Sequence, residues 1–208
     1  MKQATDANLE PAVLGLLTLL ALAWSAVQPY DHLTWWLEVT PVLVALPILL
    51  ATFRDHRLSP LLYRLIFLHA LILIVGGHYT YARVPLGLWV QDWLDLTRNH
   101  YDRVGHIAQG FVPALIAREI LLRATPLTRG AWLNLLIVCV CLAISATYEL
   151  TEWLAALVSE EAAESFLGTQ GDNWDTQWDM FLALCGALLA LPLAAVHDRS
   201  MRAAGIRS

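Results

Sequence analysis

The sequence of 208 residues is poor in charge and in cysteine. Charged residues make up 15% of the chain, whereas 58% of its residues are hydrophobic and the mean hydropathy is +0.54. Soluble domains carry about 25% charged residues, so this composition excludes an ordinary water-soluble domain. The cysteines, Cys139, Cys141 and Cys185, are odd in number and lie in apolar runs. A disulfide framework is therefore excluded, and we expect them to pack as small hydrophobic side chains.

The sequence also lacks an excess of basic residues and any familiar catalytic motif. Its formal net charge is -5, and no basic stripe with interleaved aromatic residues is present, which excludes nucleic acid as a partner. A His-Glu-x-x-His motif, a Walker loop, a nucleophile elbow and paired Cys-x-x-Cys motifs are all absent. Membrane lipids are the surroundings that this composition predicts.

Long apolar segments predict an all-α fold, a polytopic transmembrane helical bundle of about six spans. A helix needs roughly 20 apolar residues to cross the hydrocarbon region of a bilayer. Without a repeat or polar linker, we expect a single integral-membrane domain over residues 1–208. The first segment follows a weakly charged start, so we expect a retained helix and not a cleavable signal peptide. The predicted spans are residues 11–28, 33–53, 60–77, 102–123, 131–157 and 175–196.

The distribution of Lys and Arg predicts the orientation of these spans. Six spans place most basic residues on one side, which is therefore expected to be cytoplasmic, with both termini. The protein is then expected in a bacterial inner membrane. The opposite side keeps Arg83 and Arg98, and its last loop carries Glu160, Glu161 and Glu164. The basic residues of the cytoplasmic side are Lys2, Arg54, Arg57, Arg123, Arg129, Arg199, Arg202 and Arg207.

A short segment between spans three and four is predicted to lie on the outer membrane surface. In Leu-Gly-Leu-Trp-Val-Gln-Asp-Trp-Leu-Asp-Leu, residues 86–96, apolar side chains recur at helical spacing with two aspartates between them. This pattern is typical of a short interfacial helix.

Histidines and carboxylates of four spans are predicted to meet at the outer, periplasmic end of the bundle. Ionisable residues in spans are costly, so each is a functional candidate. Asp102 and His106 lie one turn apart on span four, as do Asp175 and Asp179 at the start of span six. Glu38, at the outer start of span two, is a further candidate. The cluster also draws on His78, His100, Glu149, Glu152, Arg103 and Asp172.

These side chains predict a divalent-metal site and a general base beside it. Imidazole and carboxylate groups are ligands for Zn, Mn or Fe, and a bound metal acidifies water. Glu149 or Glu152 is the predicted base, and Arg103 is predicted to hold an anion. The predicted metal ligands are His78, His100, Asp102, His106, Asp172, Asp175 and Asp179.

Structural roles are alternatives for several of these residues. Asp172, like Ser59, is a candidate helix N-cap, because a short oxygen side chain accepts hydrogen bonds from free amides. Arg103 can pair with Asp102 or Glu149 in a network that fixes helix register without chemistry.

For other polar residues the structural role is the prediction. His69 lies alone within span three, so we expect a hydrogen-bonded packing residue. At the cytoplasmic ends of spans, Arg118 and Glu119 are explained by snorkelling to the interface. His56 and His197 suggest no site there.

Several longer motifs carry a resemblance to a known family. They are His-Tyr-Thr-Tyr at 78–81, Asn-His-Tyr-Asp-Arg-Val-Gly-His at 99–106 with Gln-Gly-Phe at 109–111, Tyr-Glu-Leu-Thr-Glu-Trp at 148–153, and Gly-Thr-Gln-Gly-Asp at 168–172 with Trp-Asp-Thr-Gln-Trp-Asp at 174–179. With them the chain closely resembles YjdF-like bacterial inner-membrane proteins over residues 10–197. The resemblance implies a membrane location and no reaction. A fainter similarity, Asp-x-x-x-His opening a helix, links it to VanZ-like membrane proteins.

Three classes of function stay open at this point. A metal-dependent hydrolase or lipid-modifying enzyme, acting on a lipid or another amphiphile, fits a polar pocket on one side of the membrane. A proton- or metal-coupled transporter needs polar residues that continue through the middle of the membrane to the cytoplasmic side. The sequence has few polar residues in the middle of its spans. A non-catalytic accessory protein needs the polar network for packing alone.

Overall fold

In a computed structural model, residues 2–158 and 169–206 are described, and their regular structure is entirely helical. The predicted all-α fold is confirmed. The acidic residues Glu160, Glu161 and Glu164 lie outside the described residues, as does Gly168. The elements are α1 (Lys2–Ser25), α2 (His32–Thr52), α3 (Pro60–Tyr79), the 3-10 helix η1 (Tyr81–Arg83), α4 (Pro85–Leu94), α5 (Tyr101–Ala124), α6 (Ala131–Val158), α8 (Asp175–Ala190), the 3-10 helix η2 (Leu191–Leu193) and α9 (Ala194–Ala203).

Five helical segments of the described residues are long and apolar enough to cross a membrane, which confirms a polytopic helical membrane protein. They are Asn8–Ser25, His32–Thr52, Pro60–Tyr79, Ala131–Leu157 and Asp175–Ala203. The sixth predicted span corresponds to α5, which has 24 residues and is long enough at about 1.5 Å per residue. Its mean hydropathy is too low to qualify by composition, because charged and other polar residues interrupt the apolar sequence. Because α5 packs against α3, α6 and α8, those charges lie inside the bundle.

Local sequence signals explain where several helices begin and end. The carboxylate of Asp31 caps α2 by accepting a hydrogen bond from the Thr34 amide at 2.7 Å. Pro60 and Pro85 open α3 and α4, at a position where a missing amide hydrogen costs nothing. Asp95 ends α4 in a left-handed conformation with φ 50°. The predicted interfacial segment is therefore a helix of its own.

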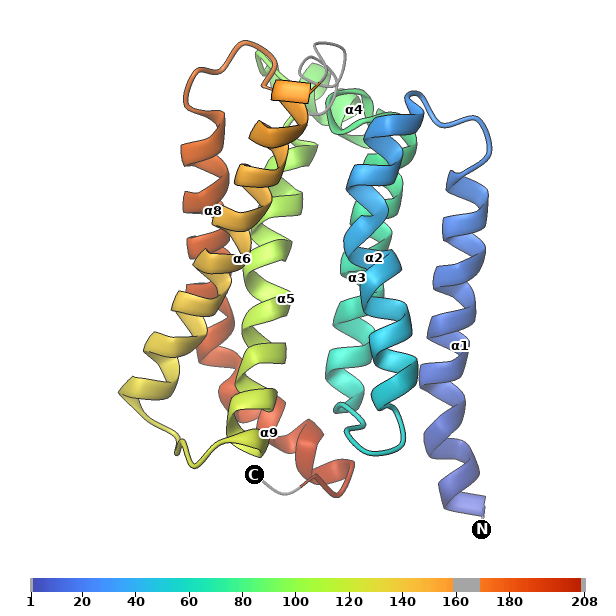
Figure 1. The fold of residues 1–208 in the computed structure, drawn as a ribbon, viewed down its shortest axis with the longest axis vertical. Helices are drawn as coiled ribbons and strands as arrows, with labels where there is room; N and C mark the ends of the chain where they lie inside the picture. Colours follow the sequence, from blue (N-terminus) through green and yellow to red (C-terminus); the bar gives the residue numbers. More distant parts are fainter. Residues whose placement is uncertain (1, 159–168, 207–208) are drawn as a thin grey trace.

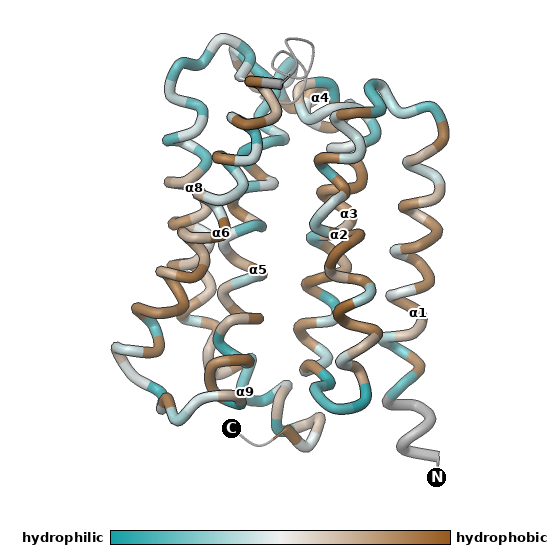
Figure 2. Tube along the Cα trace, in the orientation of Figure 1, coloured by the Kyte–Doolittle hydropathy of each residue, from teal (hydrophilic) through white to brown (hydrophobic). Residues whose placement is uncertain are grey.

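The long helices run side by side, and short helices cover both ends of the bundle (Figure 1). α4 lies across one end, called the α4 end below, and α9 lies across the other, called the α9 end. α1 begins at the α9 end, so the chain starts and finishes at the same end of the bundle (Figure 1). Figure 2 shows hydrophilic residues gathered at both ends and hydrophobic residues along the middle of the helices.

Two glycines bring α5 and α8 into backbone contact. A Cβ atom on Gly110 would overlap the carbonyl oxygen of Ala183, and one on Gly186 would overlap that of Ile107. Small residues allow membrane helices to approach this closely. The contact lies one helical turn from His106 on α5 and one turn from Asp179 on α8, so it positions these two side chains opposite each other.

The largest apolar core fills the half of the bundle nearer the α9 end. Its fully buried side chains come from α3, α5, α6 and α8, and include Leu62, Leu115, Leu133, Ile137 and Cys141. The cysteines are free, as predicted, and Cys141 is part of this core. The core separates the polar residues of the two ends.

Candidate metal centre

Side chains from α5, α6 and α8 converge on His106 near the α4 end. The His106 side chain is 7% exposed. Its Nε2 atom lies 3.3 Å from Asp102 Oδ1 and 3.7 Å from Asp179 Oδ1. Its Nδ1 atom lies 3.0 Å from Gln109 Oε1 and 3.8 Å from Glu149 Oε1. The imidazole is thus surrounded by oxygen atoms on both nitrogen sides.

Two groups of ligand atoms in this cluster can hold a metal ion. Asp102, His106 and Asp179 form one group, and His106, Glu149 and Glu152 form the other. Within each group the nitrogen and carboxylate oxygen atoms all lie within 4.8 Å of one another. All five residues belong to the predicted set, although Glu149 and Glu152 were predicted as bases and not as ligands.

Several buried oxygen atoms of the cluster lack a hydrogen-bond partner among the described residues. They are both carboxylate oxygens of Glu149 and Oδ1 of Asp179. A buried carboxylate without a partner is costly, and a cation supplies the missing interaction. The cluster contains more carboxylates than positively charged side chains. A bound cation would balance this excess of negative charge.

A separate ion-pair network holds the start of α8. Arg98 is 7% exposed and lies 2.6 Å from Asp175 and 3.5 Å from Asp172. Arg103 lies 3.1 Å from Asp172, and its guanidinium lies over the Trp178 ring at 5.3 Å from the centroid. Pairing of Arg103 with Asp102 or Glu149, the alternative considered from sequence, is not the arrangement found. The carboxylates of Asp175 and Asp172 therefore form ion pairs with arginines.

The remaining contact of Asp172 differs from the helix N-cap role that was the structural alternative for this residue. Its Oδ1 accepts a hydrogen bond from the Trp174 amide at 2.9 Å, just before α8 begins. Trp174 itself holds the N-cap position of α8. Asp172 therefore shapes the turn that leads into α8 while its other oxygen pairs with arginine.

Two of the predicted histidine ligands lie outside both groups. His78 ends α3, where its Nδ1 lies 3.0 Å from the Ser25 carbonyl oxygen and its ring stacks 4.5 Å from that of Trp24. His100 precedes α5 and is partly exposed. Burial, and then the charges of Arg103 and Arg98, lower the pKa of His100, so its ring is neutral at pH 7.

A cavity of about 150 Å³ lies beside His106 and reaches toward the middle of the bundle. Its polar lining comes from Glu38, Tyr81, Asp102, His106, Gln109, Tyr148 and Glu152, and its inner lining from Pro41, His69, Leu73, Gly105, Pro113 and Ile144. The Nε2 atom of His69 is buried without a partner among the described residues. The prediction of a hydrogen-bonded packing histidine is therefore wrong for this nitrogen, because the ring faces a cavity.

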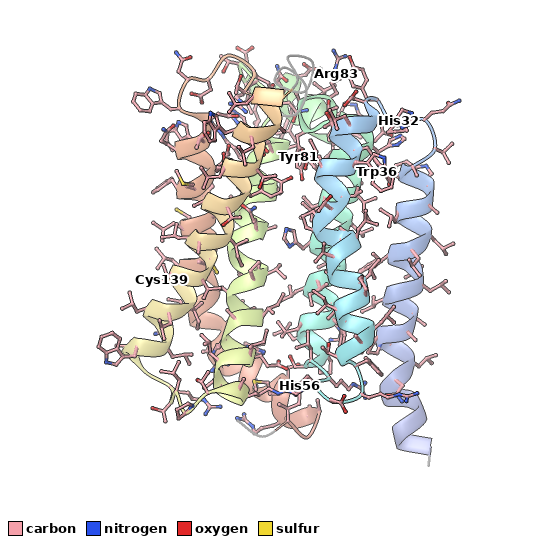
Figure 3. The ribbon with its side chains drawn as sticks, viewed as in Figure 1. His32, Trp36, His56, Tyr81, Arg83 and Cys139 are labelled. Atoms are coloured by element: carbon pink, nitrogen blue, oxygen red, sulfur yellow. The ribbon has the colours of Figure 1, made fainter. Side chains whose placement is uncertain are left out.

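Tyrosines complete the polar end of the cavity. The Tyr148 hydroxyl on α6 donates to Glu38 on α2 at 2.9 Å, which bridges the two helices. Tyr81 lies between α5 and α2 (Figure 3), beside Gly105. Burial, followed by the charge of Glu38, raises the pKa of Tyr81 well above its usual value, so its hydroxyl remains a proton donor. Glu38 is thus part of the site, as its depth suggested.

A second buried polar cluster lies at the α9 end, where the sequence suggested only snorkelling. Glu119 is fully buried and Arg118 is 3% exposed, so neither snorkels. His197 places Nε2 3.0 Å from Glu119 and Nδ1 3.2 Å from Arg118. The view that His197 suggests no site is also wrong, because α9 turns under the bundle and buries this side chain. His56, by contrast, is exposed at the α9 end (Figure 3).

The α9-end cluster is held together by many partners. Glu119 also accepts hydrogen bonds from the Ser59 amide at 3.1 Å and from Arg123 at 2.8 Å. Ser59 holds the N-cap position of α3, as predicted, but its side chain makes no capping bond. Arg118 pairs with Asp198 at 2.7 Å. These contacts clamp α3, α5 and α9 together.

Sequence reasoning missed Arg98 and this second cluster for different reasons. Arg98 was used only to assign orientation, although its place directly before Asn-His-Tyr-Asp was a signal of a role at that helix start. Arg118, Glu119 and His197 could be joined only by knowing that α9 folds back across the bundle.

Comparison with known proteins agrees with this architecture. The model of a family described as "Predicted membrane protein (DUF2238)" matches residues 11–200. The chain is also similar to "Inner membrane protein YjdF" of Escherichia coli (strain K12), at 54% identity over 203 residues, 96% of this chain and 97% of that protein. No solved structure matches the chain significantly.

Proposed function

We propose that this chain, which belongs to the DUF2238 family of membrane proteins and is a multi-pass inner-membrane protein, is a metal-dependent hydrolase or lipid-modifying enzyme. The observation that carries the proposal is the grouping of Asp102, His106 and Asp179 around one point, next to a cavity. By the distribution of basic residues, this α4 end faces the periplasm and both termini face the cytoplasm.

The hydrogen bonding of His106 favours the Nε2 side as the metal position. Gln109 Oε1 lies 3.0 Å from Nδ1 and can accept its hydrogen, which leaves the Nε2 lone pair free for a metal. The ligands of a tetrahedral site with bonds of about 2.1 Å lie about 3.4 Å apart. The distances of 3.3 and 3.7 Å from Nε2 to Asp102 and Asp179 fit that spacing.

The chemistry of the ligands narrows the choice of metal. One imidazole and two carboxylates suit Zn, Mn or Fe better than the soft thiolate-seeking ions. A divalent ion here would act as a Lewis acid and lower the pKa of a water molecule that it binds. Within the proposal, Asp175 and Asp172 serve the arginine network, and His78 and His100 are not ligands.

The two glutamates have different places in the proposed reaction. Glu152 lines the cavity, so we assign it the role of general base toward water or substrate there. Glu149 lies on the Nδ1 side of His106, 3.8 Å from that nitrogen, and is not a ligand of the proposed ion. Arg103 has an Nε–H group without a hydrogen-bond partner among the described residues, so it can hold an anionic group in addition to its contact with Asp172.

Transport and purely structural roles are the alternatives to this proposal. The apolar core around Leu62, Leu115 and Ile137 separates the cavity from the α9-end cluster, which supports a one-sided site over a path through the membrane. A purely structural network leaves the buried Oδ1 of Asp179 without a hydrogen-bond partner among the described residues, whereas a cation beside His106 Nε2 would supply one.

We expect detergent-purified protein from metal-supplemented cells to contain about one divalent ion per chain by elemental analysis. His106→Ala should lose that ion, because it removes the ligand common to both groups. His78→Ala is the matched control, since His78 lies near the same end but bonds to Ser25. Wild-type protein without stoichiometric metal, or equal metal in both variants, would contradict the proposal.

A further inference from the structure

The cavity beside His106 opens onto the membrane-facing side of α6. An open groove there is lined by Val140, Ala143, Ile144, Thr147, Tyr148 and Thr151. Two of these residues, Ile144 and Tyr148, also line the cavity. Ile144 is 41% exposed, so the cavity wall at this point is also part of the lipid-facing surface.

The helices on either side of this opening are loosely joined. α2 packs against α3, whereas α6 packs against α5 and α8. Across the opening, the Tyr148 hydroxyl bonds to Glu38 at 2.9 Å, at the polar end of the cavity. A ligand can therefore pass between α2 and α6, on the membrane-centre side of this hydrogen bond, without breaking a packed helix interface.

The groove is about as long as half the thickness of the hydrocarbon layer of a bilayer. From Val140 to Thr151 the helix rises about 16 Å at about 1.5 Å per residue. Half of a hydrocarbon layer of about 30 Å is about 15 Å. The polar end of the groove, at Tyr148 and Thr151, lies toward the α4 end, and its apolar end, at Val140, lies about 6 Å past the middle of the Ala131–Leu157 span.

The volume of the cavity limits which part of a ligand can enter. A cavity of about 150 Å³ is comparable to one that holds a benzene molecule, so it accommodates a linkage and not a whole lipid. The chain of an amphiphile must then stay outside, along α6. His69 lines the inner part of the cavity, and its buried Nε2 has no hydrogen-bond partner among the described residues.

We propose that the groove on α6 binds the single hydrocarbon chain of an amphiphile, whose ester or phosphoester linkage enters the cavity between α2 and α6. This inference rests on the proposed function for the chemistry at His106. Binding of the hydrocarbon chain in the groove is tested independently of metal binding. A transmembrane helix of a second copy would also fit small residues such as Ala143 and Thr147, but it would not place a polar linkage in the cavity.

Photolabelling tests the groove directly. The purified full-length protein is reconstituted into phosphatidylethanolamine and phosphatidylglycerol vesicles that contain a lysophosphatidylglycerol with a diazirine in its palmitoyl chain. We expect labelling to concentrate on residues 140–151 of α6, and excess unlabelled lysophosphatidylglycerol to reduce it severalfold. Labelling spread evenly over the lipid-facing helices, with no competition, would overturn the proposal.

A matched pair of variants separates the groove from general lipid contact. Thr147→Trp fills the groove and should lower labelling of α6 severalfold. Thr40→Trp should leave it unchanged, because Thr40 lies outside the groove but is also exposed and makes the same hydrogen bond to the carbonyl four residues earlier, at 2.7 Å in both cases. Equal labelling of the two variants, or efficient cross-linking between cysteines placed at Thr147 of two copies, would contradict chain binding.

Metal content measured on the same samples distinguishes the two proposals. If competitive labelling of α6 persists in His106→Ala, the groove is supported whether or not the metal is lost. If wild-type protein contains metal but α6 is not labelled competitively, the groove proposal fails and the metal centre stands.

Discussion

Replacing Glu119 by alanine is expected to lower the free energy of unfolding by about 3–5 kcal/mol, the usual cost of breaking a buried ion pair on one side. Glu119 is fully buried and accepts hydrogen bonds from Arg123 and the Ser59 amide. Its removal leaves Arg123 and His197 without their carboxylate partner in the interior. The loss of helical circular dichroism on heating in detergent measures the effect.

An exposed ion pair in the same protein provides the control. Glu10 pairs with Arg64, and their side chains are 40% and 60% exposed. Exposed pairs contribute about 0–1 kcal/mol, so Glu10→Ala should unfold almost as the wild type does. If Glu119→Ala were no less stable than Glu10→Ala, the α9-end cluster would not be the clamp described above.

Adding the bound metal is expected to stabilise the wild-type protein by about 4 kcal/mol when the free ion is at 1,000 times its dissociation constant. Ions that bind only the folded chain shift its unfolding equilibrium by mass action. Asp179→Asn should abolish this shift, because Asp179 supplies an oxygen to the group around His106 Nε2. Thermal unfolding with increasing Zn²⁺ or Mn²⁺ measures it.

Asp175, one turn earlier on α8, is the matched control. Its carboxylate lies 2.6 Å from Arg98 and belongs to the arginine network. Asp175→Asn should lower the starting stability and yet keep the full response to metal. An equal loss of response in both variants would mean that the two aspartates act together, as the sequence alone suggested.

The helices were predictable because hydropathy and length decide whether a segment crosses a bilayer. The exception is α5, whose charges violate that rule and are tolerated because neighbouring helices bury them. Spacing also predicted that Asp102 and His106 share a helix face. The close contact of Gly110 with α8, which places Asp179 opposite His106, depends on tertiary packing.

The sequence predicted how deep in the membrane the site residues lie. It did not predict which neighbouring helix each side chain faces. His78 and His106 both lie near the α4 end, but His78 faces α1 and bonds to Ser25. The burial of Glu119 depends on α9, which a hydropathy pattern treats as a tail after the last span. Covering by α9 changes an interfacial glutamate into a buried one, and single-helix reasoning cannot detect this.

The position of the metal is the most direct test of the central claim. Crystals of the protein grown with Zn²⁺ or Mn²⁺ would give an anomalous scattering peak at the ion. We expect a peak about 2.0–2.2 Å from His106 Nε2, with Asp102 and Asp179 as the other protein ligands of the ion. A peak at His78 or His100, or no peak near His106 at saturating metal, would contradict it.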